Sequence, residues 1–182
     1  MYVYVQKNQT TSMTQTSAPQ TASLKTYANT RYSYTVEYPS SWYAHTTNSE
    51  RDFTQRGPGG SDVIGGDTSF SNYQEEFGYD NPAPKDLFSV NLMIYKIESN
   101  TSYDQFISSK SFNSDGKENI SINGISALRL TGVTTDHPVG FTVVNTLVKV
   151  GDKMFVFNYS GSPISQQLKD NADEIINSFS AK

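Results

Sequence analysis

Residues 141–160 read FTVVNTLVKVGDKMFVFNYS, and this segment gives the strongest indication of the fold. Two apolar runs flank Gly151 and Asp152, a dipeptide that suits the two-residue loop of a β-hairpin. Both runs are apolar at successive positions, whereas a strand with one face in water alternates apolar and polar residues. We therefore expect two neighbouring strands at the centre of a sheet that is covered on both faces.

Further strands precede this hairpin. Residues 87–97, LFSVNLMIYKI, form an alternating run, so one face of the strand carries Phe88, Val90, Leu92 and Ile94. Downstream, the runs ISI and ALRLTGV lie on either side of the dipeptide Asn123-Gly124, which suits a tight type I′ turn. The sequence therefore predicts an antiparallel meander.

Two segments have helical periodicity. In residues 102–112, SYDQFISSKSF, Ser102 and Gln105 have the spacing of a capping box. In residues 162–179, SPISQQLKDNADEIINSF, we expect Ser162 as the N-cap and Pro163 at the first helical position. The apolar stripe of this second helix consists of Ile164, Leu168, Ala172, Ile175, Ile176 and Phe179.

The N-terminal half contains a strand rich in aromatic residues. YSYTVEY alternates over residues 32–38, and Pro39 ends the run because proline has no N–H for the ladder. The aromatic residues concentrated around this strand are Tyr27, Tyr32, Tyr34, Tyr38 and Trp42. They are either an exposed platform for a sugar or peptide, or part of the core. The regular period favours the core.

These elements predict one α+β domain, an α/β/α sandwich with a central antiparallel sheet. We place the domain at residues 27–182 and a disordered Ser/Thr/Gln-rich spacer at residues 1–26, because the spacer has too few apolar residues to offset its ordering entropy. Such a spacer either follows a removed signal or membrane anchor, or is the disordered end of a cytosolic protein. We favour the first explanation.

Composition excludes several classes of function. The chain has 182 residues, no cysteine and two histidines, so thiolate metal sites, disulfides and a thiol nucleophile are excluded. A net charge of −4 gives no electrostatic basis for binding nucleic acid or an anionic membrane. The polar residues are mostly Ser, Thr and Asn, which is typical of extracytoplasmic domains. Sequons for N-glycosylation occur at Asn8, Asn100, Asn119 and Asn158.

The segment TYANTRYSYTVEYPSSW, residues 26–42, resembles the opening of PsbP-like domains, whose pattern ends in YP-x-x-W. The order of the later segments is also similar: SYDQFISSKSF, SINGISALRLTG, the hairpin through Gly151-Asp152 and a final helix ending IINSF. The resemblance covers residues 26–182. Ser33 departs from it, because the family usually has glycine there; we expect serine to be compatible with an ordinary strand at this position.

The resemblance implies an α/β/α sandwich, a fold shared with a Ran-binding nuclear transport factor. Plant and cyanobacterial members of the family are extrinsic subunits of photosystem II that support calcium and chloride retention. Many bacterial and archaeal relatives have a spacer and an anchor and no known role, and this chain is more similar to that surface-displayed group. The family pattern contains no catalytic residues, and a photosystem role does not follow from fold alone.

Residues 50–86, which we call the acidic insert, have eight acidic and three basic residues, a net charge of −5. Long loops in compact domains are usually functional or disordered. Hard cations prefer several carboxylate oxygens, so the candidate calcium ligands are Asp62, Asp67, Glu75, Glu76 and Asp80. Their spacing matches no known calcium loop, and a solvated or partner-facing acidic surface is the favoured interpretation. GPGGSDVIGG is expected to be a loop, and DTSFSNY a short strand through Phe70.

Evidence for catalysis is weak. His45 follows Trp42 at a strand end, and Asp136 and His137 are adjacent in a turn beside a proline, where side chains usually face water. The chain contains no G-x-S-x-G, HExxH, GxGxxG or P-loop pattern. An unpatterned Ser–His–Asp hydrolase would need His45 or His137 within about 2.6–3.2 Å of a nucleophile.

The sequence therefore predicts a monomeric, non-catalytic binding or accessory module outside the cytoplasmic membrane. It is expected to hold an unidentified protein partner at the cell envelope through the acidic insert or a sheet edge, without a cofactor. Contact with a membrane would be only through an N-terminal anchor. The alternative is a surface protein that binds calcium or a small ligand through the acidic insert.

Overall fold

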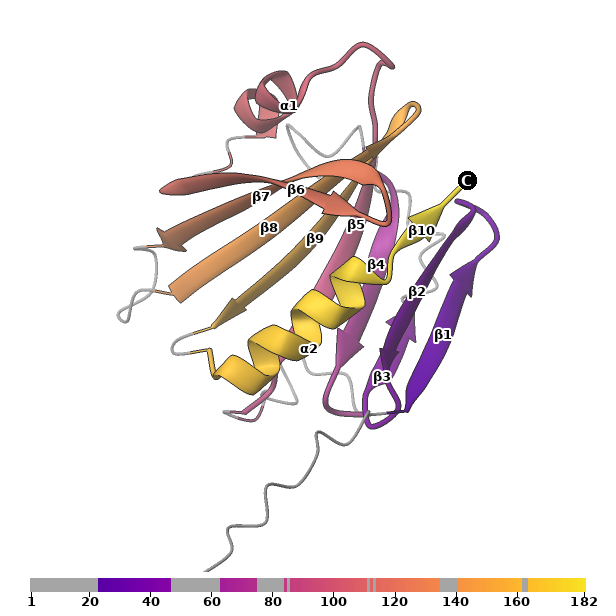
Figure 1. Ribbon diagram of the computed structural model, residues 1–182, viewed down its shortest axis with the longest axis vertical. Helices are drawn as coiled ribbons and strands as arrows, with labels where there is room; N and C mark the ends of the chain where they lie inside the picture. The colour runs from indigo at the N-terminus through magenta and orange to yellow at the C-terminus, as the bar shows by residue number, and fades with distance from the viewer. Residues whose placement is uncertain are drawn as a thin grey trace, which may run out of the picture.

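The computed structural model describes residues 23–46, 63–74, 84, 86–110, 112, 114–134, 141–161 and 164–182. Its main feature is a seven-stranded sheet in which all neighbours are antiparallel (Figure 1). In spatial order the strands are β3 (Tyr43–Thr46), β4 (Val63–Ser71), β5 (Ser89–Lys96), β9 (Lys153–Gly161), β8 (Phe141–Val150), β7 (Ile125–Thr134) and β6 (Gly116–Ile122). The hairpin expected at residues 141–160 therefore lies within the sheet, as predicted.

The two predicted turns form. Asn123 and Gly124 have φ values of 48° and 82°, as a type I′ turn requires at both central positions. At the other hairpin Gly151 has a φ of 60°, and Val150 pairs directly with Lys153. These two-residue loops fix the register, and register decides which side chains reach each face.

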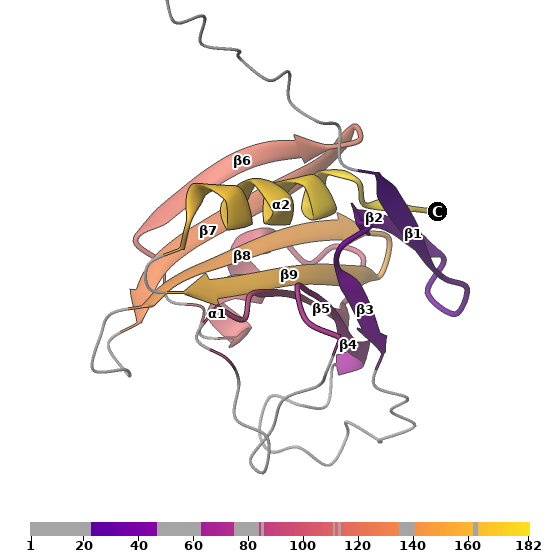
Figure 2. The ribbon, with the colours of Figure 1, turned by 90° about the horizontal axis from the view of Figure 1, so that it is seen from below.

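One face of the large sheet is covered by α2 (Gln166–Asn177) and by a second sheet, in the order β1 (Leu24–Asn29), β2 (Tyr34–Pro39) and β10 (Ser180–Ala181). Figure 2 shows the large sheet curving around α2, with α1 (Tyr103–Lys110) on the opposite side. Both faces are thus covered, and the architecture is the predicted α+β sandwich.

The larger core lies on the α2 face. Alternate residues of β5 and β9 point into it, and the predicted stripe of α2 packs against them, with Ala172, Ile175 and Ile176 fully buried. The aromatic residues around β2 also belong here: Tyr34 and Trp42 are buried, and Tyr27, Tyr32 and Tyr38 pack against the cluster. The core interpretation of these aromatics is confirmed.

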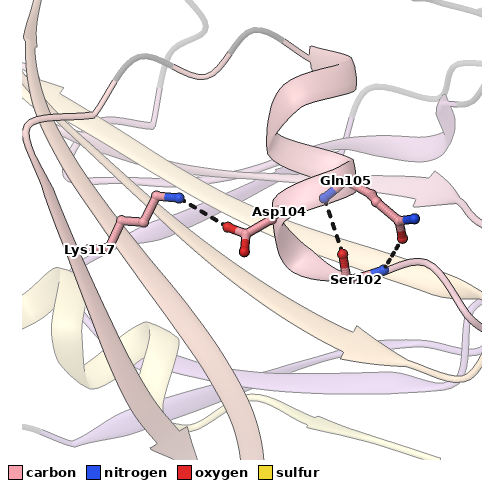
Figure 3. A network of polar contacts seen from close by, with 4 residues as sticks. All are labelled: Ser102, Asp104, Gln105 and Lys117. Carbon is pink, nitrogen blue, oxygen red and sulfur yellow. Dashed lines mark hydrogen bonds and ion pairs between the residues drawn. The ribbon is translucent and has the colours of Figure 1, made fainter.

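A smaller core lies on the α1 face, where Phe106 and Ile107 of α1 pack on Met154, Val156 and Leu147 of the central strands. The predicted capping box forms: the Gln105 N–H donates to Ser102 Oγ at 3.2 Å, and the Ser102 N–H donates to Gln105 Oε1 at 2.8 Å (Figure 3). An ion pair of 3.0 Å between Lys117 and Asp104 links α1 to β6.

Three local expectations were wrong. The N-cap of α2 is Ser165, whose Oγ accepts from the Leu168 N–H, and the helix begins at Gln166, so Ser162 is not the N-cap and Pro163 is not the first helical residue. Ser33 lies in the loop between β1 and β2 with a φ of 55°, not in a strand; this left-handed conformation is one that glycine adopts at lower cost than serine. Finally, β4 already begins at Val63, so Val63–Gly66 is strand because it pairs with β5, although its glycines suggested a loop.

The two ends of the domain differ slightly from the expected boundaries. The first strand of the domain begins at Leu24, slightly before the expected boundary at residue 27, and residues 1–22 lie outside the described part. The final strand, β10, pairs with β2 and was not expected, because two residues carry no periodic signal.

Candidate functional site

The best-defined polar cluster lies in the C-terminal half of the acidic insert, where the chain leaves β4 and approaches β5. We call His45, Ser71, Asn72, Tyr73 and Asp86 the insert base. His45 comes from β3, Ser71 ends β4, and Asp86 lies just before β5. The Tyr73 hydroxyl donates to Asp86 Oδ1 at 2.7 Å, which joins the two ends of the segment between them.

Asn72 adds hydrogen bonds between the same two chain ends. Its Nδ2 donates to the Asp86 carbonyl at 2.9 Å, and its Oδ1 accepts from the Phe88 N–H at 2.9 Å. The backbone of Asn72 also donates to the Phe88 carbonyl at 3.3 Å. The two chain ends at residues 72–73 and 86–88 are therefore held together by side-chain and backbone hydrogen bonds.

His45 and Ser71 are close enough to suggest a base and a nucleophile, with 3.0 Å between Nε2 and Oγ. However, Nε2 also lies 2.9 Å from the Tyr73 carbonyl oxygen, which can only accept, so Nε2 carries the proton. The Ser71 hydroxyl donates to the same carbonyl at 2.7 Å, and Ser71 is buried. In this geometry Nε2 has no lone pair for the serine proton, and the pair holds Tyr73 in place.

The candidate calcium ligands are not brought together in the described structure. Asp62, Glu75, Glu76 and Asp80 lie outside the described residues, and Asp67 is described only as backbone of β4. Asp136 and His137 also lie outside them. Within the described part of the chain, no group of three or more His, Asp or Glu side chains could hold a metal ion. The calcium site stays a prediction.

A row of polar side chains crosses the α1 face of the sheet. His45, Ser69, Asn91, Asn158 and Asn145 are paired in turn across β3, β4, β5, β9 and β8, and directly paired residues point to the same face. The Asn158 amide donates to Asn145 Oδ1 at 2.8 Å. This row was not predicted from the sequence, because strand register brings together residues that are far apart in the chain.

A cavity of about 600 Å³ lies beside α1. The loop that forms one wall is fixed, because Lys149 Nζ donates to the carbonyls of Ser99 and Thr101, at 2.7 Å each. Several lining polar groups already bond within the protein, including Gln105 in the capping box and Ser109, which donates to the Phe106 carbonyl. The lining residues are Ile64, Lys96, Ile97, Glu98, Asn100, Thr101, Gln105, Phe106, Ser109 and Lys110.

The sequons differ in accessibility. Asn100 and Asn119 are exposed, in a turn and on the edge strand β6 respectively, whereas Asn158 is half-buried and bonded to Asn145. Asn8 lies outside the described residues. Among the helices that are described, none has the length and apolar character needed to cross a membrane.

Solved structures identify the architecture. Cyanobacterial PsbP (CyanoP) from Synechocystis sp. PCC 6803 matches with a TM-score of 0.57 and 15% identity over 90% of this chain and 95% of its own. The fold is PsbP-like. LpqN of Mycobacterium tuberculosis, a protein involved in cell envelope biogenesis, shares this PsbP-like fold with a TM-score of 0.52 and 13% identity, over 89% of this chain and 86% of its own.

A Bacteroides thetaiotaomicron protein matches with a TM-score of 0.54 and 14% identity, over 87% of this chain and 48% of its own. No protein-family model matches the sequence. No curated protein matches it either. The predicted PsbP-like fold is therefore confirmed by structure, at sequence identities that carry no information about activity.

Proposed function

We propose that the protein is a non-catalytic binding module outside the cytoplasmic membrane, and that it holds a protein partner through the acidic insert. The observation that carries this proposal is the insert base. Its hydrogen bonds tie Asn72 and Tyr73 to Asp86 and Phe88, so the part of the acidic insert between β4 and β5 is held to the sheet at both of its ends. Binding residues are often placed on loops that a rigid scaffold positions.

The chemistry of the insert indicates the kind of partner. Its net charge of −5 exceeds that of the whole chain, −4, so a basic protein surface is the complementary partner. His45 and Ser71, the described residues best suited to catalysis, are both bonded to the Tyr73 carbonyl. A location outside the cytoplasm is supported by LpqN, a protein of the same fold that is involved in cell envelope biogenesis.

The test is in-cell crosslinking of the tagged protein to envelope proteins, with quantification of each crosslinked species. In the test variant, Asp62, Asp67, Glu75, Glu76 and Asp80 are replaced by Asn or Gln. We expect this variant to lose the crosslinked partner. We also expect the complex of the native protein to weaken as salt is added, since salt screens exposed charges. The control is E118Q with E174Q, which removes two exposed acids outside the insert, one from β6 and one from α2.

Loss of the partner in the control but not in the insert variant would contradict the proposal and assign binding to a sheet edge or helix. The calcium alternative is tested separately by melting the native protein in calcium. A ligand that binds only the folded state adds about 2.7 kcal/mol of stability at 100 times its dissociation constant. A calcium-dependent rise in melting temperature that is absent from the insert variant would favour the alternative.

A further inference from the structure

Three buried polar atoms beneath α2 have no hydrogen-bond partner among the described residues: Arg129 Nε, Thr146 Oγ1 and the Tyr159 hydroxyl. Thr146 is 0% exposed and Tyr159 is 1% exposed, so bulk water does not reach them. Buried polar groups in proteins are nearly always bonded to protein or to ordered water. Three such atoms in one region therefore need a common explanation.

The sheet register brings the three side chains together. Arg129 of β7 is paired directly with Thr146 of β8, and Tyr159 of β9 is paired with Val144, two residues from Thr146 on the same strand. All three therefore point to the same face, the one that α2 covers. Directly paired side chains are about 5 Å apart at Cβ, and diagonal neighbours are within reach of long side chains.

The helix supplies the fourth member of this group. Arg129 forms an ion pair of 2.8 Å with Asp173 of α2, and both side chains are mostly buried. Burial raises the pKa of Tyr159 to about 12, the Asp173 carboxylate adds to this rise and the Arg129 guanidinium opposes it. The tyrosine hydroxyl therefore lies within electrostatic reach of the ion pair.

The chemistry of the site favours a small neutral ligand. The guanidinium disfavours a cation, and the Asp173 carboxylate disfavours an anion. The Arg129 Nε–H can only donate, whereas the two hydroxyls can donate and accept. One water molecule can accept from Nε and from one hydroxyl and donate to the other hydroxyl, which is the usual number of bonds for a buried water.

We infer that one ordered water molecule is bound between α2 and strands β7–β9 by Arg129, Thr146 and Tyr159. It completes the hydrogen bonding of the ion pair that joins α2 to the sheet. The site is independent of the proposed partner surface, because none of its residues belongs to the acidic insert.

The first test is a high-resolution crystal structure together with water-selective NMR of the whole protein. We expect density for one water within hydrogen-bond distance of all three atoms, and magnetisation transfer from a long-lived water to the Arg129 Nε proton. A direct hydrogen bond between any two of the three groups, without a water, would overturn the inference.

The second test uses T146V and Y159F, which remove each hydroxyl at nearly constant shape. If one water bonds both hydroxyls, each single variant should have a lower melting temperature than the native protein. The melting temperature of the double variant should then be little below that of the less stable single variant. The control is T146V with Y95F, since Tyr95 lies on the α1 face; these two shifts should add. If the hydroxyls were unsatisfied instead, each single variant would melt at a higher temperature, because removing an unpaired buried hydroxyl is stabilising.

Discussion

The two faces of the seven-stranded sheet differ in how they are closed. On the α2 face aromatic rings pack in contact with one another: Phe179 lies 4.9 Å from Phe155 and 5.4 Å from Phe157 between ring centroids. On the α1 face a helix of eight residues contributes two buried side chains to a smaller core, and a row of polar side chains also crosses this face. We therefore expect the larger core on the α2 face to contribute more to the free energy of unfolding than the α1 face, which includes a cavity and polar groups.

The largest test of this comparison is a pair of core truncations. F157A removes a fully buried ring on the α2 face and should lower the free energy of unfolding by about 3–5 kcal/mol. F106A, the matched change in α1, should cost about 2–3 kcal/mol, because a short helix can move toward the cavity and partly fill the space. Urea unfolding measures both, and equal losses would show that the two faces contribute equally.

The second largest expected effect is a loss of folding stability at alkaline pH, caused by two tyrosines in the core on the α2 face. Burial raises the pKa of Tyr34 and of Tyr159 to about 12, whereas an unfolded tyrosine titrates near 10. The folded state therefore holds these protons more tightly, and the resulting stability is present below about pH 10 and lost as pH rises toward 12. The loss is up to about 3 kcal/mol for each tyrosine, at about 1.4 kcal/mol per pKa unit.

The measurement is urea unfolding across this pH range, with tyrosinate absorbance followed in parallel. Y159F should reduce the loss between pH 10 and 12, because one of the two tyrosines whose pKa is raised to about 12 is gone. Ionisation of all tyrosines near pH 10 in a protein that stays folded would contradict the prediction.

A smaller effect is expected from the capping box at the N-terminus of α1. S102A removes the acceptor of the capping box and should cost about 1 kcal/mol. The cost should be local, so amide exchange in α1 should speed up while that of the central strands stays unchanged. S108A, an exposed change within the same helix, is the control and should have little effect. Equal acceleration in both variants would mean that the cap is unimportant.

The smallest expected effect concerns Ser33 in the loop between β1 and β2. S33G relieves a left-handed conformation that costs an L-residue about 1–2 kcal/mol, and part of this gain is offset by the added freedom of the unfolded chain. We expect a net gain of about 0.5 kcal/mol in thermal unfolding. G124A, at a φ of 82°, is the opposite change and should destabilise the protein. A loss in S33G would show that the serine side chain stabilises the loop.

Local sequence signals predicted much of the fold. The alternation of residues 88–94, the stripe of α2, both two-residue turns and the Ser102–Gln105 capping box depend only on neighbours in the chain. The N-cap of α2 was misplaced because Ser162 and Ser165 are both acceptable caps, and packing of the helix on the sheet decides between them. Ser33 was misassigned because alternation continues through a position that the hairpin loop needs in a left-handed conformation.

By itself the sequence determined the class of the fold, both helices, most of the strands, and a chain with no cysteine, two histidines and a net negative charge, because these depend on composition and short-range periodicity. Only the tertiary structure decided which polar residues meet. The insert base joins residues from β3, β4 and the approach to β5, and the group beneath α2 joins three strands and a helix. The physical reason is that such contacts depend on strand register and helix packing, which no local pattern encodes.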